Sequence, residues 1–225
     1  MATTTIYLVR HCEAEGNWKR LFQGHYDGKV SELGYQQLAH LAERFCSVKL
    51  DAVYSSPLTR AMETARAINR CAQLPIQQDD GLLEINGGAF EGKPFAELPI
   101  LFAEAYDKWE HDPAHFTAPG GESMQQVYDR MRDTIDRIAR THEGGTVAIA
   151  SHGCAIRNYQ CYVRGLPLSQ VNSVTWCDNT AVNCIEYDSG FQPHIIYLND
   201  TSHLPEGCSS FMKQTWWRKN QEESK

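Results

Sequence analysis

An apolar run near the start of the chain ends abruptly in charged residues, and it restricts the fold more than any other feature. The run covers residues 6–9, Ile-Tyr-Leu-Val, and Arg10 and His11 follow it directly. A continuous stretch of branched and aromatic residues is typical of a strand buried on both faces, as in a parallel sheet. In open α/β sheets the ligand site lies beyond the carboxyl ends of the strands. Arg10 and His11 therefore stand where such a fold carries its chemistry.

A second copy of this arrangement lies far downstream. Residues 146–150 form another short apolar run, and Ser151, His152 and Gly153 follow it. A lone histidine after a strand is more often a structural residue. Two buried strands that each end in a histidine indicate a functional site much more strongly than either strand alone.

The segments between these runs alternate between helix-type and strand-type patterns. Helices are predicted from about residues 31, 57, 123 and 155, and short strands at 51–55, 75–76, 181–187 and 194–198. We therefore expect an α/β three-layer sandwich, with a mostly parallel central sheet and helices on both faces. No internal repeat or linker interrupts the pattern, so residues 1–200 are predicted to form one domain, followed by a C-terminal tail at 201–225.

Two segments carry more detailed predictions. Ser56 is a natural N-cap and Pro57 suits the first position of a helix, which places Arg60 in a first helical turn directly after a strand. The unpaired N–H groups of such a helix start favour an anion, and a guanidinium adds a fixed fork of donors. Residues 93–119 carry many aromatic residues and predict one or two helices, interrupted at Pro99, that form a lid.

Composition excludes several classes of function. The 225 residues carry a formal charge of −7 without a run of basic residues, which argues against nucleic-acid and membrane-surface partners. No apolar run approaches the roughly 18 residues that span a bilayer, and the N-terminus lacks the pattern of a signal peptide. The eight cysteines include no CxxC pair, so reduced thiols in a cytoplasmic protein are expected rather than a disulfide framework.

The polar residues expected at strand ends or in the loops after them form one chemical set. Two arginines, two histidines, an amide and a carboxylate suit a ligand with several oxygens and more than one negative charge, since arginine matches phosphate bidentately. A neutral imidazole can attack phosphorus while a carboxylic acid protonates the departing alcohol, and the cations stabilise the transferring group. The set is Arg10, His11, Asn17, Arg60, Glu84 and His152.

These residues fall within motifs that resemble the histidine phosphatase superfamily, in its phosphoglycerate mutase-like branch (branch 1). The first motif is Leu8-Val9-Arg10-His11-x-Glu13-x-x-x-Asn17. Four others follow in the family's order: Gln23-Gly24 with Asp27; Ser55-Ser56-Pro57-Leu58-x-Arg60-Ala61-x-x-Thr64-Ala65; Leu82-x-Glu84-x-x-x-Gly88-x-x-Glu91-Gly92; and Gly121-Glu122-Ser123 with Ser151-His152-Gly153. Together they cover nearly the whole chain up to about residue 190.

The resemblance implies a role for each matching residue. His11 would be the phosphorylated nucleophile and Glu84 the proton donor and later the base. The phosphate pocket would be lined by Arg10, Asn17, Arg60 and His152, with Gln23 and Gly24 on the substrate side. Family members need neither a metal nor an organic cofactor for phosphatase chemistry.

The chain departs from the family at one position and leaves some choices open. Cys12 replaces the family's glycine after the nucleophile, which puts the usual close backbone approach in doubt; Cys154 could lie near it, and inert buried thiols are preferred to an oxidisable pair. Glu13 competes with Glu84 as the acid, but it follows the nucleophile too closely and is expected to order its loop. Glu122 is interpreted as a helix-start residue. Residues 179–181 are a further candidate border of the pocket.

The favoured function is hydrolysis of a small-molecule phosphomonoester through a phosphohistidine on His11. The nearest alternative is a bisphosphoglycerate-dependent phosphoglycerate mutase, which we associate with a longer insertion and a paired-arginine segment; residues 93–119 contain no arginine. A metallohydrolase is disfavoured because no H-E-x-x-H spacing occurs, and a catalytically dead phosphate-binding module because all six site residues are present. The physiological substrate, and whether the chain forms a homodimer, stay open.

Overall fold

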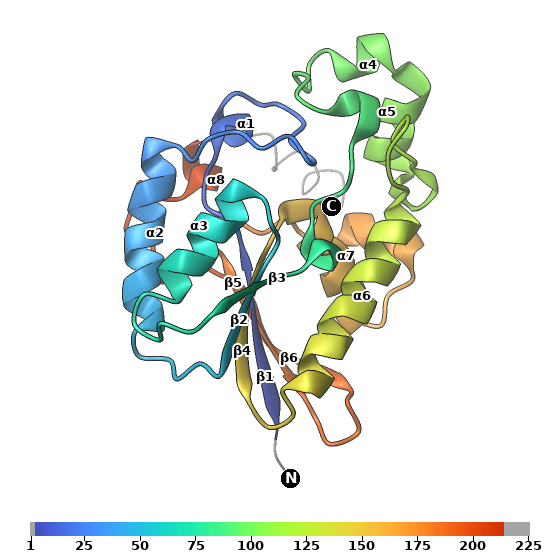
Figure 1. The fold of residues 1–225 in the computed structure, drawn as a ribbon. Helices are drawn as coiled ribbons and strands as arrows, with labels where there is room; N and C mark the ends of the chain where they lie inside the picture. The colour runs from blue at the N-terminus through green and yellow to red at the C-terminus, as the bar shows by residue number, and fades with distance from the viewer. Residues whose placement is uncertain (1–2, 214–225) are drawn as a thin grey trace.

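A six-stranded sheet forms the centre of the computed structural model, which describes residues 3–213 (Figure 1). The strand order is β3-β2-β4-β1-β5-β6. Four neighbours, β3, β2, β4 and β1, pair in parallel, and β5 and β6 continue the sheet antiparallel. The predicted mostly parallel sheet is therefore confirmed. The strands are β1 (Thr4–Arg10), β2 (Ala52–Ser55), β3 (Ile76–Gln78), β4 (Thr146–Ser151), β5 (Val182–Tyr187) and β6 (Pro193–Asp200).

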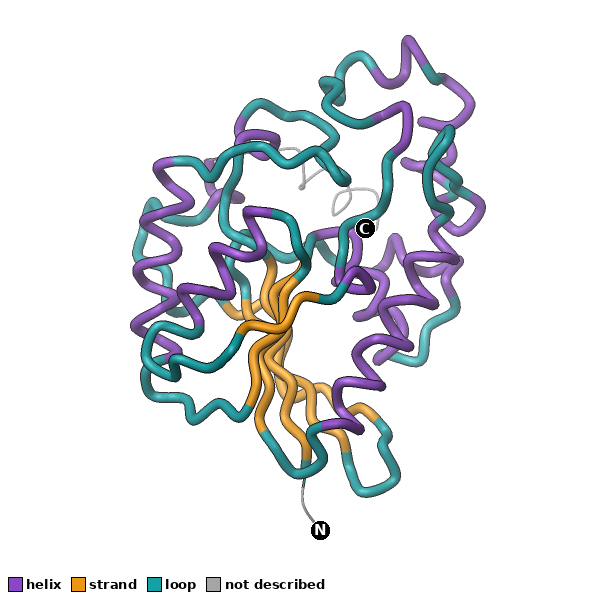
Figure 2. The backbone as a smooth tube through the Cα atoms, in the orientation of Figure 1, coloured by secondary structure: helices purple, strands orange, loops and turns teal. Residues whose placement is uncertain are grey.

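Helices cover both faces of this sheet, as Figure 2 shows. Along β1, Ile6 and Leu8 point into the core beneath α6 and α7, whereas Val9 packs with α2 and α3. Each of these side chains is fully buried, which stabilises the fold by roughly 1.5–3 kcal/mol per residue. The four helices are α2 (Glu32–Phe45), α3 (Thr59–Ile68), α6 (Met124–Thr141) and α7 (Gly153–Val163).

The predicted lid is present, but its helices break at a different residue. Two helices, α4 (Leu98–Leu101) and α5 (Ala103–His111), are followed by the 3₁₀ turn η3 (Pro113–His115). The expected interruption at Pro99 is wrong, because proline is tolerated in a first helical turn and Pro99 occupies that place in α4. The chain turns instead at Phe102, whose φ is −141° and ψ is 48°.

The described part of the tail packs against the body rather than extending away from it. The short helix α8 (Ser210–Lys213) follows Ser209, whose hydroxyl binds Asp178, and the hydroxyl of Ser210 donates to Glu13 at 2.9 Å. Trp216 and Trp217, which we expected to pack back or meet a partner, lie outside the described residues.

The cysteines correct one expectation. Cys46, at the end of α2, and Cys71, just after α3, form a disulfide with a Cα–Cα distance of 5.2 Å, so not every thiol is reduced. The other six are free and buried. No helix within residues 3–213 is both long and apolar enough to cross a membrane.

Candidate active site

The two histidines meet because β1 and β4 are neighbours in register. Arg10 pairs with Ser151 at the ends of the two strands, and the amide of His11 donates to the carbonyl of Ser151 at 2.9 Å. The rings of His11 and His152 consequently lie with their centroids 5.1 Å apart. The end of β2 lies on the other side of β4, because the amide of Ser56 donates to Ala150. Three parallel strands thus deliver their following residues to one edge.

His11 is held in the form that a nucleophile requires. Its Nδ1 lies 2.6 Å from the carbonyl oxygen of Cys12, and since a carbonyl only accepts, Nδ1 carries the proton and Nε2 keeps its lone pair. Burial, together with the charges of Arg60 and Arg10, holds the pKa of His11 well below that of an exposed histidine. The ring is therefore neutral at neutral pH.

His152 lies behind His11 and supports Arg60. Its Nδ1 accepts from Nε of Arg60 at 3.2 Å, so Nε2 carries the proton and donates to the hydroxyl of Ser56 at 2.7 Å. Burial and the charge of Arg60 lower the pKa of His152 as well. The ring is fully buried and does not line the cavity described below. The structure thus brings His152 to the site without exposing it to a ligand.

Arg60 lies in the first turn of α3, as expected, but the helix begins later than predicted. Leu58 is the N-cap residue instead of Ser56. The reason is tertiary: the carboxylate of Asp27, from a distant loop, accepts from the backbone amide and hydroxyl of Thr59 and caps the helix. The hydroxyl of Ser56 is left to bind His152.

The guanidinium of Arg60 is buried and fixed by the loop that follows β1. Nη2 donates to the carbonyl of Gly24 at 2.7 Å and Nη1 to that of Tyr26 at 2.8 Å. Burial lowers the pKa of Arg60 to about 10, so it stays charged at neutral pH. Gly24 has a φ of 47°, and a Cβ there would lie 2.3 Å from the carboxylate of Glu91, so glycine is required.

Arg10 presents an unsatisfied donor. Nη1 donates to the carbonyl of Cys177 at 2.6 Å, whereas the buried Nε has no hydrogen-bond partner among residues 3–213. Gly153 lies beside it: a Cβ on Gly153 would approach this Nε to 3.3 Å. Because a buried donor without a partner costs about 1–3 kcal/mol, the site is arranged to receive an acceptor that the described part of the chain does not supply.

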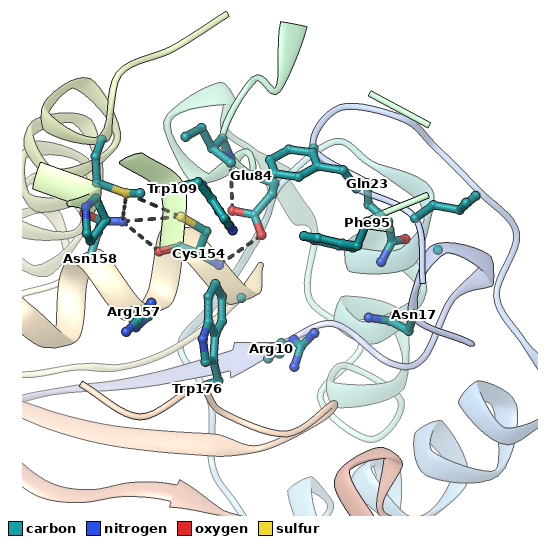
Figure 3. A pocket seen from close by; sticks show the side chains of 18 of the residues that line it. Arg10, Asn17, Gln23, Glu84, Phe95, Trp109, Cys154, Arg157, Asn158 and Trp176 are labelled. Carbon is teal, nitrogen blue, oxygen red and sulfur yellow. Dashed lines mark hydrogen bonds between the residues drawn. The ribbon is translucent and has the colours of Figure 1, made fainter. Parts of the chain in front are cut away.

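Arg10, His11 and Arg60 line one cavity of about 230 Å³ between the strand ends and the lid (Figure 3). Of the predicted site residues, seven of the eight line it: Arg10, His11, Asn17, Gln23, Gly24, Arg60 and Glu84. The side-chain oxygen of Asn17 accepts from the amide of Ala14 and so orders the turn after His11. A buried oxygen of Gln23 lacks a partner in the part of the chain that the structure describes.

Glu84 reaches the cavity from a loop without regular secondary structure. Its carboxylate lies on the N-terminus of α7, where Oε2 accepts from the amide of Cys154 at 3.0 Å and Oε1 from that of Ala155 at 2.9 Å. In Figure 3 this carboxylate faces the same space as Arg10. A carboxyl group therefore lies across the cavity from the cations.

Cys12 resolves the doubt about the missing glycine. Its side chain is fully buried beneath α3, with Sγ 3.7 Å from the carbonyl of Arg60, and it does not line the cavity. Burial raises the pKa of Cys12 to about 12. Burial also raises the pKa of Cys154 well above its usual range, so both thiols are poor candidates for reactive thiolates.

Glu13 and Glu122 lie where the sequence analysis expected them, whereas the expectation that residues 179–181 border the pocket is wrong. Glu13 accepts from the hydroxyls of Ser31 and Ser210 and orders its loop away from the cavity. Glu122 precedes Ser123, the N-cap of α6. Asn179 does not line the cavity; its side chain donates to the backbone carbonyl of His11 at 2.9 Å.

Several cavity residues were missed. Arg20 adopts a left-handed φ of 58° and stacks over Phe95 of the lid, 5.2 Å from its ring centroid. Arg157, on α7, lies 4.6 Å from the ring centroid of Trp176. Positive φ and inter-element stacking leave no local pattern, although Arg157 stands five residues after His152 and could have been placed on the first turns of that helix.

Among residues 3–213, no cluster of three His, Cys, Asp or Glu side chains is arranged to hold a metal ion.

Comparison with known proteins agrees with this geometry. Residues 6–201 match the model of the histidine phosphatase superfamily, branch 1. Phosphoserine phosphatase 1 of Hydrogenobacter thermophilus is 33% identical over 201 residues, covering 89% of this chain and 94% of that protein. Phosphoglycerate mutase-like protein 4 of Arabidopsis thaliana is 35% identical over 204 residues, covering 89% of this chain and 87% of that protein.

Solved structures show the same fold. YhfR of Bacillus stearothermophilus superposes with a TM-score of 0.85 at 34% identity, covering 89% of this chain and 98% of that one. A phosphoserine phosphatase mutant of Entamoeba histolytica, in complex with phosphoserine, has a TM-score of 0.80 at 25% identity and covers 90% and 100%. With its paired strand-end histidines, two buried arginines and facing carboxyl group, this chain belongs to the histidine phosphatase superfamily, branch 1, and is a phosphatase.

Proposed function

We propose that the protein hydrolyses a small phosphomonoester in two steps through a phosphohistidine on His11. The observation that carries this proposal is the tautomer of His11: Nδ1–H donates to the Cys12 carbonyl, so the Nε2 lone pair is available in a cavity that also holds Arg10, Arg60 and Glu84. The two cations offset the charge of the phosphoryl group. Their interaction with this group strengthens as charge develops on it in the transition state.

In the first step, Nε2 of His11 forms a bond to phosphorus while the bond from phosphorus to the alcohol oxygen breaks. The protonated carboxyl of Glu84 gives its proton to that oxygen. In the second step, water attacks the phosphorus, Glu84 takes a proton from the water, and the P–N bond breaks. Inorganic phosphate leaves, and His11 returns to its neutral form.

The cavity favours a phosphomonoester whose leaving alcohol carries a carboxylate, as in L-phosphoserine. Arg157 lines the cavity, is 7% exposed and forms no ion pair with any described residue. It donates to the carbonyl of Val174 and to Asn172, and its remaining donors are available to a ligand. The charge of Glu110 favours this cation without forming an ion pair with it. Burial of a cation without an ion pair is costly, so an acidic ligand would relieve it. Relatives named phosphoserine phosphatase support this choice.

A phosphate-release assay tests both the proposed hydrolysis through His11 and the proposed preference for a substrate with a carboxylate. L-phosphoserine is compared with O-phosphoethanolamine, which lacks only the carboxylate, and His11→Ala is the control. We expect turnover that His11→Ala abolishes and EDTA leaves unchanged, a phosphoryl group trapped on His11, and a kcat/KM at least about 10-fold higher for phosphoserine.

The same assay separates the mutase alternative. The lid contributes no cation to the cavity; its lining residues are Phe95, Tyr106, Trp109, Glu110 and Pro113. We therefore expect 3-phosphoglycerate, given with a trace of bisphosphoglycerate, to yield no 2-isomer. Isomerisation without free phosphate would overturn the hydrolase proposal.

A further inference from the structure

One ion pair outside the cavity holds the segment that carries Glu84. Glu122 and Arg130 form a bidentate pair, with Nε of Arg130 2.8 Å from Oε1 and Nη2 2.9 Å from Oε2. Neither side chain lines the cavity, and the two are about one-fifth exposed. Burial alone would raise the pKa of Glu122, but the hydrogen bonds and charge of Arg130 outweigh it and lower that pKa. The Glu122 carboxylate is therefore charged at neutral pH.

The remaining donors and acceptors of this pair all bind the backbone around Glu84. Nη1 of Arg130 donates to the carbonyl of Leu83 at 2.6 Å and to that of Gly81 at 3.1 Å, and Nη2 donates to the carbonyl of Glu84 at 2.9 Å. Oε2 of Glu122 accepts from the amide of Asn86 at 2.8 Å. One guanidinium and one carboxylate thus bind backbone groups of four residues between 81 and 86.

This segment depends on such contacts because residues 83–87 form neither helix nor strand. Its carbonyls lack the regular backbone hydrogen bonds of a helix or strand, so side chains have to supply their donors. The side chain of Glu84 is held on its other side by the amides of Cys154 and Ala155 at the N-terminus of α7. The position of the carboxyl group is therefore set from two directions, by α7 and by the pair that Glu122 forms with Arg130 of α6.

We propose that the Glu122–Arg130 pair positions Glu84 for proton transfer to the leaving alcohol. The inference rests on the proposed function, since it assigns Glu84 the acid role. Arg130 is a positioning residue: it touches no substrate and acts only through the backbone of the segment from Gly81 to Asn86. A planar fork is required, because a lysine at 130 would keep the charge but could not bind Glu122 and three carbonyls together.

The dependence of the rate on the leaving group tests this role. A nitrophenolate leaves without being protonated, whereas an alkoxide must receive a proton in order to leave. For Arg130→Met we expect kcat/KM to fall by about 10-fold or more with L-phosphoserine or another hydrolysed alkyl phosphate, and by less than about 3-fold with p-nitrophenyl phosphate. Arg130→Lys should give a smaller loss of kcat/KM, which is again larger with the alkyl phosphate than with p-nitrophenyl phosphate. Arg132→Met is the matched control, because Arg132 lies on the same helix and, within residues 3–213, forms ion pairs with Asp129 and Asp133 only.

A double substitution separates positioning from a general loss of structure. In a Glu84→Gln background, Arg130→Met should cause no further loss with the alkyl phosphate, since both changes remove the same proton transfer. Equal losses on both substrates, or losses that multiply in the double variant, would overturn the proposal. If Arg130→Met does not fold, Glu122→Gln makes the same test with a shape-preserving change. Full activity of His11→Ala would instead refute the proposed function, independently of the pair.

Discussion

At the scale of single residues, the site works by keeping its nucleophile neutral among cations. The Nδ1 proton of His11 is bound to a backbone carbonyl, and Arg10 and Arg60 disfavour a second proton. His152 is likewise neutral and offers its Nδ1 to Arg60. Because Arg60 keeps its charge, the pocket retains the positive field that a phosphoryl group needs while the imidazole retains its lone pair.

The buried histidines predict that stability falls at acidic pH. The pKa values of His11 and His152 are lowered in the folded state, by burial first and by Arg60 next, so the unfolded chain binds protons at these residues at a higher pH than the folded chain. Their contribution is therefore complete above the unfolded pKa of about 6.5. It is lost as the pH falls towards the folded values, by up to roughly 1.4 kcal/mol per pH unit for each histidine.

Urea unfolding at a series of pH values from about 7.5 down to about 5.5 measures this slope. His11→Ala should reduce the slope by the share of one histidine. A free energy of unfolding that stays level across the window would show that both rings bind protons equally well in the two states.

At the scale of elements, sequence patterns located the strands and helices but not all of their ends. Ser31 caps α2 and Ser123 caps α6, at the residues from which these helices were predicted to begin, because their side chains accept from amides within the next turn. The start of α3 could not be predicted, because its cap is Asp27, 32 residues away in sequence. Pro99 was predicted to interrupt the helices of the lid. Proline disrupts the interior of a helix but is accepted in its first turn, so the residue type alone did not show which position it would occupy.

The disulfide between α2 and the turn after α3 gives an element-scale prediction. Cys46 and Cys71 are separated by 25 residues, so their bond restricts the unfolded chain and should contribute about 3 kcal/mol. Replacing both by alanine, or adding a reductant, should lower the free energy of unfolding by about that amount. Phosphatase activity should not change, because neither residue lines the cavity. Equal urea midpoints with and without reductant would contradict the prediction.

At the scale of the whole molecule, the cavity is closed by contacts between the lid and two other segments. The ring of Trp109 lies 5.1 Å from that of Phe22, in the loop after β1, and 6.4 Å from that of Trp176, which precedes β5. Asn172 donates to the backbone carbonyl of Glu110 at 3.2 Å. The wall on the leaving-group side is therefore assembled from three separate parts of the chain.

Trp109→Ala should open this wall. We expect a loss of about 2 kcal/mol in the free energy of unfolding, because a half-buried aromatic is removed. We also expect a KM for L-phosphoserine that rises more than kcat falls, and a relative gain for a bulky ester such as naphthyl phosphate. Trp18→Ala, at an exposed tryptophan outside the cavity, is the control. An unchanged preference between the two esters would show that Trp109 does not limit the size of the leaving group.

The amino-acid sequence by itself determined the fold class, the two histidine-bearing strands and seven of the residues that line the cavity, because apolar periodicity and the residues after each strand are local properties. Only the tertiary structure decided that His152 lies behind His11, that Asp27 caps α3, and that Glu122 and Arg130 hold the segment of Glu84. Each of these contacts joins residues far apart in sequence or depends on backbone direction, and no local pattern encodes which distant group satisfies a buried donor.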